Sequence, residues 1–362
     1  MSVDDPAPKN KGSRGVKKLK SIRIGGVRIA PGTQELVAIP VANLSNQMPV
    51  TLPVSVFHGA RPGPTAFVCA AIHGDELTGV EVVRRLLRIP ELEHLAGTLL
   101  AVPVVNGYGF ISRSRYLPDR RDLNRSFPGT SRGSLGAQLA HKFMQEVVQR
   151  SDFGIDLHTA AVHRTNLPQI RTSLATPRSR ALARAFGAPV ILYANEREGS
   201  LRAAASELGI DVLVYEGGEG LRLDELSVRA GVLGVLRCLA DAGMIDLPED
   251  ATSDVTPVFA RGSRWMRAGE GGVVRTFKTS GDSVSEGEVI GMIESPYGGG
   301  ETEITAAFAG IIIGRTNLPV VNLGDAVFHI AEVRAPEDAE TAVGDHVRAL
   351  EGDPVFDEDE IM

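Results

Sequence analysis

The sequence predicts an α/β protein, in which a mixed, mostly parallel sheet carries helices on both faces and is followed by a small all-β unit. Three observations predict this fold class. Between residues 45 and 245, apolar runs of strand length alternate with amphipathic stretches of helical period, which is the pattern of a sheet covered on both faces. The turn-rich segment "PEDATSDVTP" at 248–257 interrupts this alternation. Beyond it, short β-branched runs are separated by glycine turns, which is typical of an all-β unit.

The individual elements follow from the same periodicities. Apolar runs bounded by polar or turn residues predict strands at 65–72, 98–106, 153–157, 189–193 and 211–216. Apolar residues at helical spacing predict helices at 78–88, 134–150, 177–186, 199–208 and 221–243. We therefore expect a first domain at 21–250, preceded by a disordered basic tail at 1–20.

The C-terminal part is expected to form a second domain at 257–334, followed by an acidic tail at 335–362. The stretches "SGDSVSEGEVIGMIES", "TAAFAGIII" and "PVVNLGDAVFHI" resemble the paired quasi-repeats of lipoyl and biotinyl domains, which implies a barrel-sandwich-like fold. A carrier domain of that kind needs a lysine at the tip of its central hairpin. The corresponding tip here, "SPYGGGE", contains no lysine, so we expect a structural or gating role without a covalent cofactor.

Composition and charge exclude several classes of protein. The chain has 362 residues, 43% of them hydrophobic, and a net charge of −7 at pH 7. A negative charge argues against nucleic acid as the main partner, because phosphate binding needs a basic face. No apolar run is long enough for a transmembrane helix, and the polar start is not a secretory signal. The only two cysteines, Cys69 and Cys238, lie far apart in apolar segments, which predicts a cytoplasmic protein without disulfides.

The first candidate site follows the predicted strand at 65–72. This apolar run stops at His73-Gly74-Asp75-Glu76, immediately before a predicted helix. Side chains at such a strand end project into the crevice at the carboxyl edge of an α/β sheet, and Gly74 permits a tight turn or a close backbone approach. His73 and Glu76 can therefore supply a nitrogen and an oxygen to zinc. On its own the pattern His-x-x-Glu is weak, because it occurs often by chance.

A second histidine ends another predicted core strand. In "SDFGIDLHTA", residues 151–160, the buried run reaches His158. Two strand ends of one sheet can bring their histidines to one centre, and a catalytic zinc needs three protein ligands and one open position. His73, Glu76 and His158 make such a set. The alternative is that His158 only caps its strand by hydrogen bonding.

The loop "SRYLPDRRDLNRSFPG" at 114–129 completes the pattern with the sequence Asp-Leu-Asn-Arg. Together with His-x-x-Glu, Asp-Leu-His-Thr and a late Glu-Gly in this order, it resembles the succinylglutamate desuccinylase/aspartoacylase family. The resemblance covers roughly residues 50–245 and implies a zinc carboxypeptidase-like fold. It also implies that His73, Glu76 and His158 hold one Zn²⁺ per chain.

The resemblance assigns further roles by position. Asn124 and Arg125 match the pair that grips the carboxylate of the substrate, a contact that suits a planar guanidinium. Asp122 is expected to hold a zinc-binding histidine by its far ring nitrogen. Glu216 in "LVYEGGEG" matches the catalytic glutamate; Glu219, beyond the glycines, is the poorer candidate.

One arginine is expected to polarise the scissile carbonyl. The family places it shortly before Asn-Arg, where Arg113, Arg115, Arg120 and Arg121 compete in this chain. We favour Arg115 because it precedes a tyrosine, as in relatives. The loop from Arg115 to Asn124 is longer than in the short-loop members, so the register stays open at this point.

The resemblance implies a zinc-dependent amidohydrolase that cleaves a small N-acyl amino acid with metal-activated water. One alternative is a related zinc carboxypeptidase acting on a short peptide or an amino-acid-tagged substrate. A second is a non-catalytic binding protein on the same fold, which is disfavoured because the ligands and the catalytic glutamate are all present. The sequence predicts neither a nucleic-acid nor a membrane partner, permits a homo-oligomer, and leaves the acyl group and the amine open.

Overall fold

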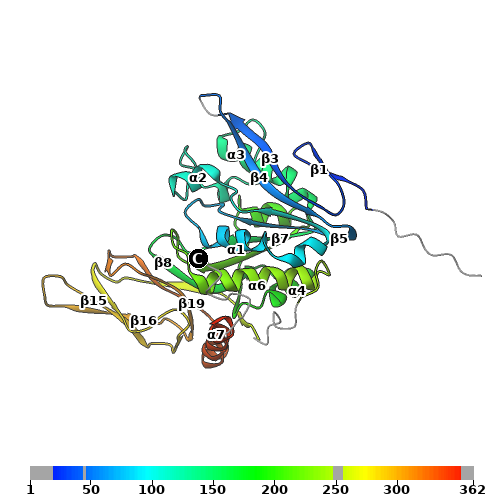
Figure 1. Cartoon of the computed structure of the whole chain (residues 1–362). Coiled ribbons are helices and arrows are strands. Elements are labelled where there is room, and N and C mark those ends of the chain that lie inside the picture. Colours follow the sequence, from blue (N-terminus) through cyan, green and yellow to red (C-terminus); the bar gives the residue numbers. More distant parts are fainter. Residues whose placement is uncertain (1–18, 44–45, 248–255, 352–362) are drawn as a thin grey trace, which may run out of the picture.

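The computed structural model describes residues 19–43, 46–247 and 256–351. Its centre is a 13-stranded sheet, in which the order of the main strands is β12-β19-β17-β8-β10-β7-β5-β6-β4-β3 (Figure 1). The bounds are β3 Thr33–Asn43, β4 Pro49–His58, β5 Arg61–Ala70, β6 Ala96–Val102, β7 Phe153–His158, β8 Arg164–Thr172, β9 Val190–Tyr193, β10 Asp211–Gly218, β11 Val258–Ala260, β12 Ser263–Arg267, β14 Ser283–Val284, β17 Gly310–Thr316 and β19 Ala326–Ala331.

The middle of this sheet is parallel. Strand β5 runs parallel to β6 and β7, and β10 runs parallel to β7, whereas β4 and β8 are antiparallel to their neighbours β6 and β10. All four central strands therefore end at one edge of the sheet, where loops carry side chains into a common crevice. The predicted mixed sheet is confirmed, with parallel strands at its centre, although the C-terminal strands and β3 and β4 make most pairings of the whole sheet antiparallel.

Helices cover both faces of the sheet. Successive side chains of a strand point to opposite faces, so a strand that is apolar throughout has two faces to bury. In β5, Ala66 and Val68 join one apolar core and Phe67 and Cys69 join the other. The first core is completed by α1 (Thr78–Leu86), α4 (Pro177–Phe186) and α6 (Glu225–Asp241). The second is completed by α3 (Leu135–Glu146) and α5 (Leu201–Ser206). In Figure 1, α3 lies on the side of the sheet opposite to α1, α4 and α6.

Several elements differ from the sequence prediction. The predicted helix at 134–150 is α3 followed by a short 3₁₀ helix, η3 (Val148–Arg150). The periodicities did not predict β3, β4, the small pair β1 (Ile22–Ile24) and β2 (Val27–Ile29), or the short helices η1 (Pro90–His94), α2 (Gly107–Ser112) and η2 (Leu123–Arg125). Nor did they predict β8, because a stretch with several polar residues and a proline is not typical of a central strand.

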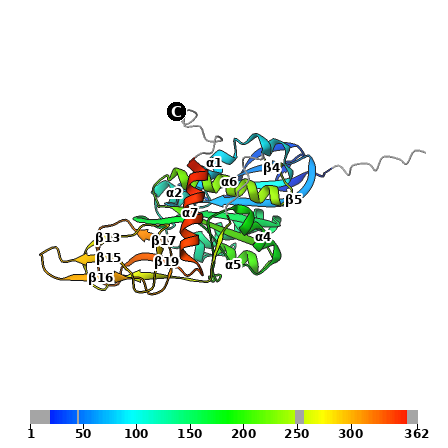
Figure 2. The same cartoon turned by 90° about the horizontal axis from the view of Figure 1, so that it is seen from below.

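The C-terminal strands extend the main sheet rather than standing apart from it. Strand β17 pairs with β8 and β11 pairs with β9. A separate four-stranded sheet, of order β16-β15-β13-β18, projects away from the body in Figures 1 and 2. Its strands are β13 (Gly272–Thr276), β15 (Val289–Glu294), β16 (Glu301–Thr305) and β18 (Val320–Val321).

The segment expected to be an acidic tail at 335–362 contains a helix, α7 (Pro336–Glu351). Its buried residues Ala339, Val343, His346 and Leu350 lie three or four positions apart, so one face of the helix packs on the body. Leu350 joins the core of α6, and its carbonyl accepts a hydrogen bond from Arg229 at 3.0 Å.

Three expected segments lie wholly or largely outside the described residues: the remainder of the acidic tail, almost all of the basic tail at 1–20, and most of the expected linker. In the part of the chain that is described, no helix has the length and apolarity needed to cross a membrane.

Candidate active site

The loop after β5 is shaped by a glycine. A Cβ atom on Gly74 would lie 1.9 Å from the carbonyl carbon of Gly109 and 2.1 Å from the nitrogen of Phe110, both in the backbone of α2. Only glycine allows this approach, as the sequence suggested. The loop then turns back, with the Glu76 N–H donating to the carbonyl of His73 at 3.2 Å, before α1 begins at Thr78.

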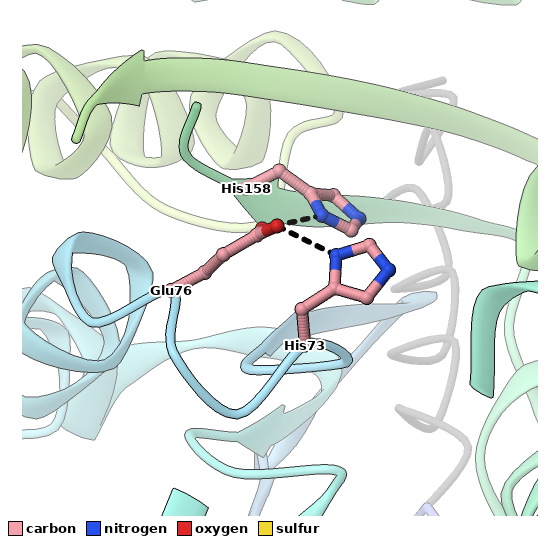
Figure 3. Close-up of side chains that lie close together, drawn as sticks. All are labelled: His73, Glu76 and His158. Atoms are coloured by element: carbon pink, nitrogen blue, oxygen red, sulfur yellow. Dashed lines mark hydrogen bonds and ion pairs between the residues drawn. The ribbon is translucent and has the colours of Figure 1, made fainter. Parts of the chain in front are cut away.

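Three side chains converge at the carboxyl edge of the sheet. Nδ1 of His73 lies 2.6 Å from Oε1 of Glu76, and Nδ1 of His158, at the end of β7, lies 2.7 Å from Oε2 (Figure 3). All three residues are buried, with 5% exposure or less. One donor atom from each lies within 4.8 Å of the others, so the group could hold a metal ion.

The far nitrogen of each imidazole contacts another carboxylate. Nε2 of His73 lies 3.1 Å from Oδ1 of Asp122, and Nε2 of His158 lies 2.8 Å from Oδ2 of Asp156. Such partners set the tautomer and the ring orientation of a metal ligand. Sequence reasoning missed Asp156, although it stands two residues before His158 and therefore on the same face of β7.

The electrostatics of this group favour a cation. Burial opposes ionisation of Glu76, but the charges of His73 and His158 outweigh it and lower the pKa of this carboxyl far below its ordinary value. Burial likewise opposes protonation of His158, but Asp156 and Glu76 raise the pKa of its imidazole. Two imidazole nitrogens and a carboxylate that already attract positive charge are a donor set suited to a divalent metal ion.

Of the four candidate arginines, only Arg115 lines the cleft beside this group. Its Nη1 lies 3.3 Å from Oε1 of Glu76, and its Nη2 lies 3.1 Å from Oδ2 of Asp122. Arg113, Arg120 and Arg121 are exposed outside the cleft. The guanidinium of Arg115 therefore reaches the site in a way that the other three do not.

Asn124 and Arg125 lie on η2 and line the same cleft. The side-chain oxygen of Asn124 accepts a hydrogen bond from the backbone N–H of Leu201 at 2.9 Å, which ties η2 to the start of α5. Arg125 is exposed, and its guanidinium donates to the carbonyl of Asn124. An exposed, cleft-lining guanidinium can pair with an incoming carboxylate.

The two candidate glutamates lie in different surroundings. Glu216 stands opposite His158 in the β7–β10 ladder and lines the cleft. Glu219 does not line it, because its Oε1 accepts from the His163 N–H at 2.9 Å and its Oε2 from Nδ2 of Asn317 at 2.8 Å. Glu216 therefore lies in the cleft beside the candidate metal centre, whereas Glu219 joins two loops.

The cleft has a volume of about 920 Å³ and is shared by the two halves of the chain. Ser263, Trp265 and His329 from the C-terminal strands form part of its wall. Burial, together with the charge of Arg171, lowers the pKa of His329 to about 3.

Eight arginines line the cleft: Arg115, Arg125, Arg164, Arg171, Arg197, Arg202, Arg264 and Arg267. The lining carboxylates are four: Glu76, Asp156, Glu196 and Glu216. This excess of positive charge favours an anionic small molecule.

Comparison with known proteins agrees with this architecture. A relative from Halomonas elongata, an N-alpha-acetyl-L-2,4-diaminobutyric acid deacetylase, is 28% identical over 320 residues, which cover 84% of this chain and 93% of the relative. The crystal structure of a succinylglutamate desuccinylase/aspartoacylase from Rhodobacter sphaeroides is 27% identical, with a TM-score of 0.74 over 83% of this chain and 96% of that one.

The product-bound structure of the ectoine utilization protein EutE (DoeB) from Ruegeria pomeroyi has the same fold. It is 24% identical, with a TM-score of 0.75 over 82% of this chain and 94% of that one. The model of the succinylglutamate desuccinylase/aspartoacylase catalytic domain matches residues 62–242, which include all three donors of the candidate metal centre, His73, Glu76 and His158. The chain belongs to the succinylglutamate desuccinylase/aspartoacylase family.

Proposed function

We propose that this protein is a zinc-dependent amidohydrolase that cleaves a small N-acyl amino acid. The observation that carries the proposal is the convergence of His73, Glu76 and His158 beside Glu216, in a cleft rich in arginine. Membership of a deacylase family and the likeness to a diaminobutyrate deacetylase support an amide as the bond that is cleaved. In this proposal the hydrolase domain spans residues 21–250, and residues 257–334 are a β domain that closes one side of the cleft.

His73, Glu76 and His158 would hold the zinc, because two histidines and a glutamate are a common catalytic donor set for that ion. Bound zinc supplies Lewis acidity, which polarises a carbonyl and lowers the pKa of a bound water to about 7. Asp122 and Asp156 hold the far nitrogens of the two imidazoles and so keep both rings aimed at the site.

Two residues of the chain would carry out the proton transfers and stabilise the negative charge that develops on the carbonyl oxygen. Glu216 accepts a proton from the attacking water on its carboxylate and later donates it to the amine nitrogen as the C–N bond breaks. Arg115 lies beside Glu76, where its N–H groups can donate to the oxygen that develops negative charge. The products are a carboxylic acid and a free amino acid.

Asn124 and Arg125 hold the carboxylate of the substrate in this proposal. A charge-assisted pair with Arg125 contributes on the order of 1.5–3 kcal/mol. Since about 1.4 kcal/mol corresponds to a tenfold change, Arg125→Ala should lower kcat/KM roughly 10–150-fold. Arg125→Lys should recover only part of the loss, because an ammonium keeps the charge without the planar fork.

The test begins with zinc-loaded protein and N-acetyl, N-succinyl and short peptide substrates, with release of free amine as the readout. The best substrate is then compared with its neutral carboxamide in the native, Arg125→Ala and Arg121→Ala proteins. Arg121 is the matched control, since it is an exposed arginine of the same loop outside the cleft. We expect the native and control proteins to favour the acid strongly and Arg125→Ala to favour it little. Equal use of acid and amide by the native protein would reject the carboxylate clamp, and faster cleavage of peptides would favour a carboxypeptidase.

A further inference from the structure

We propose that Asn166 is a positioning residue for Glu216, and that Gly314 of the C-terminal strand β17 makes room for this arrangement. The inference rests on the proposed function only in assigning catalysis to Glu216. It gives the C-terminal strands a part in positioning the catalytic glutamate, although they are separated in sequence from the catalytic motifs.

Both oxygens of the Glu216 carboxylate have partners on β8. Nδ2 of Asn166 donates to Oε2 at 2.8 Å, and Nη1 of Arg171 lies 3.2 Å from Oε1. Asn166 is only 6% exposed, so its amide is held by packing as well as by this contact. An amide carries no charge, so it orients the carboxylate through a directional hydrogen bond without adding another ion pair.

A register shift places Asn166 on the correct face of the sheet. Along the β8–β10 ladder Glu216 is opposite Gln169, but Gly218 is opposite Asn166, so β8 contains one extra residue between these pairs. Without that residue, Leu167 would stand opposite Gly218 on the Glu216 face. Pro168 lies within the irregular stretch, where a missing N–H is tolerated. The bulge thus turns the amide of Asn166 toward Glu216 and leaves Leu167 in an apolar core.

Gly314 leaves the space that the amide of Asn166 occupies. It pairs with Asn166 across the β17–β8 ladder. A Cβ atom at Gly314 would lie 2.7 Å from Oδ1 of Asn166 and 3.0 Å from the carbonyl of Thr165. Because Oδ1 lies against Gly314 and Nδ2 points to Glu216, a methyl group at 314 would push the amide out of its orientation.

A second contact joins the C-terminal strands to the region of Glu216. Just beyond β17, Nδ2 of Asn317 donates to Glu219, which lies three residues after Glu216. The backbone N–H of Asn317 also donates to the carbonyl of His163 at 2.8 Å, in the turn that precedes β8. The loops that flank both Asn166 and Glu216 are therefore held by the same C-terminal segment.

The test uses full-length, metal-loaded Asn166→Ala, Gly314→Ala and the double variant, with Gly269→Ala as the control. A Cβ at Gly269 would meet only a methyl group of Thr302, at 3.5 Å, and Gly269 does not line the cleft. Each of the first two variants should lower kcat about 10- to 100-fold, as expected for a misplaced catalytic group. KM should change less than about threefold and metal content should stay the same, because neither the donors nor the carboxylate clamp is touched.

The double variant distinguishes positioning from general damage to the sheet. If Gly314 acts through the amide of Asn166, adding Gly314→Ala to Asn166→Ala should cause no further fall in kcat. Multiplied losses would overturn the proposal, as would native kcat in either single variant. Crystal structures give a readout independent of turnover: Gly314→Ala should lack the contact between Asn166 and Glu216, and its retention would overturn the link through β17. If the native protein cleaved no substrate, the proposed function would fail, while this structural outcome would still decide the positioning.

Discussion

At the scale of single residues, neighbouring carboxylates orient the two histidines of the candidate metal centre. Asp156 accepts from the far nitrogen of His158 with one oxygen, while its other oxygen lies 3.4 Å from Sγ of Cys69. Burial raises the pKa of the Cys69 thiol, and the neighbouring charge of Asp156 adds to this effect. Cys69 therefore stays a protonated donor to the carboxylate that orients a candidate metal ligand.

Glu216 and its neighbour Glu219 offer a matched pair of isosteric changes. Glu216→Gln keeps the size of the side chain but removes the base, so we expect normal metal content and a loss of about 10²–10⁴ in kcat. Glu219→Gln keeps an oxygen that can accept from His163 or Asn317 and lies outside the cleft, so its kcat should stay within a few-fold of native. Steady-state kinetics and metal analysis of both proteins check this. Near-native turnover of Glu216→Gln would assign the base to another group.

At the scale of elements, helix α7 shows how composition can hide a packed structure. The acidic end of the sequence suggested a tail over 335–362, yet four buried residues of α7 follow a helical spacing. One of them, His346, is buried with no partner for its Nε2 among the described residues. Burial, with the charge of Arg237, lowers the pKa of His346 to about 4.

The lowered pKa of His346 predicts how stability changes with pH. The unfolded chain protonates this histidine below about pH 6.5, whereas the folded chain does so only near pH 4. The contribution of His346 to the free energy of unfolding is therefore intact above pH 6.5 and is lost as the pH falls toward 4. The loss is on the order of 3 kcal/mol. Urea unfolding of the native protein and of His346→Leu should show a steeper loss for the native protein between pH 6.5 and 4. Parallel profiles would contradict the assignment, since all other histidines are common to both proteins.

At the scale of the whole molecule, the sheet joins the two halves of the chain into one structure. Residues 257–334 supply β11, β12, β14, β17 and β19 to the same sheet that carries the candidate metal ligands. An apolar cluster spans the junction, with Leu167, Val190 and Leu192 on one side and Ile311 and Ile313 on the other. Separating the halves would expose this cluster and leave the edges of β8 and β9 unpaired.

We therefore expect the full chain to unfold in a single calorimetric transition. The shared strands and the shared apolar cluster couple the two halves, so neither should melt alone. Differential scanning calorimetry should give a calorimetric enthalpy close to the van't Hoff enthalpy. Hydrogen exchange should report comparable protection for β8 and β17. Two resolved transitions, with early loss of protection in β17, would show instead that residues 257–334 fold independently.

Local patterns in the sequence were enough to predict most of the helices and strands of the first domain. Strands such as β5, β7 and β10 and helices such as α1, α4 and α6 were predicted because hydrophobic periodicity is a local property. The groupings His73 with Glu76 and Asn124 with Arg125 were likewise visible, since each occupies a few consecutive positions. Asp156 also carried a local signal, because it stands on the same strand face as His158.

Contacts between segments that are distant in sequence became visible only once the chain was folded. It showed Arg115 beside Glu76, Glu219 bound to Asn317, and Asn166 bound to Glu216. Strand β8 escaped prediction because it carries several polar residues, of which Arg164, Asn166 and Arg171 line the cleft, and because its proline lies at a bulge. Whether such a stretch becomes a central strand depends on the pairing of β8 with β10 and β17, which bury its backbone. That pairing is a property of the assembled sheet, and no window of the sequence contains it.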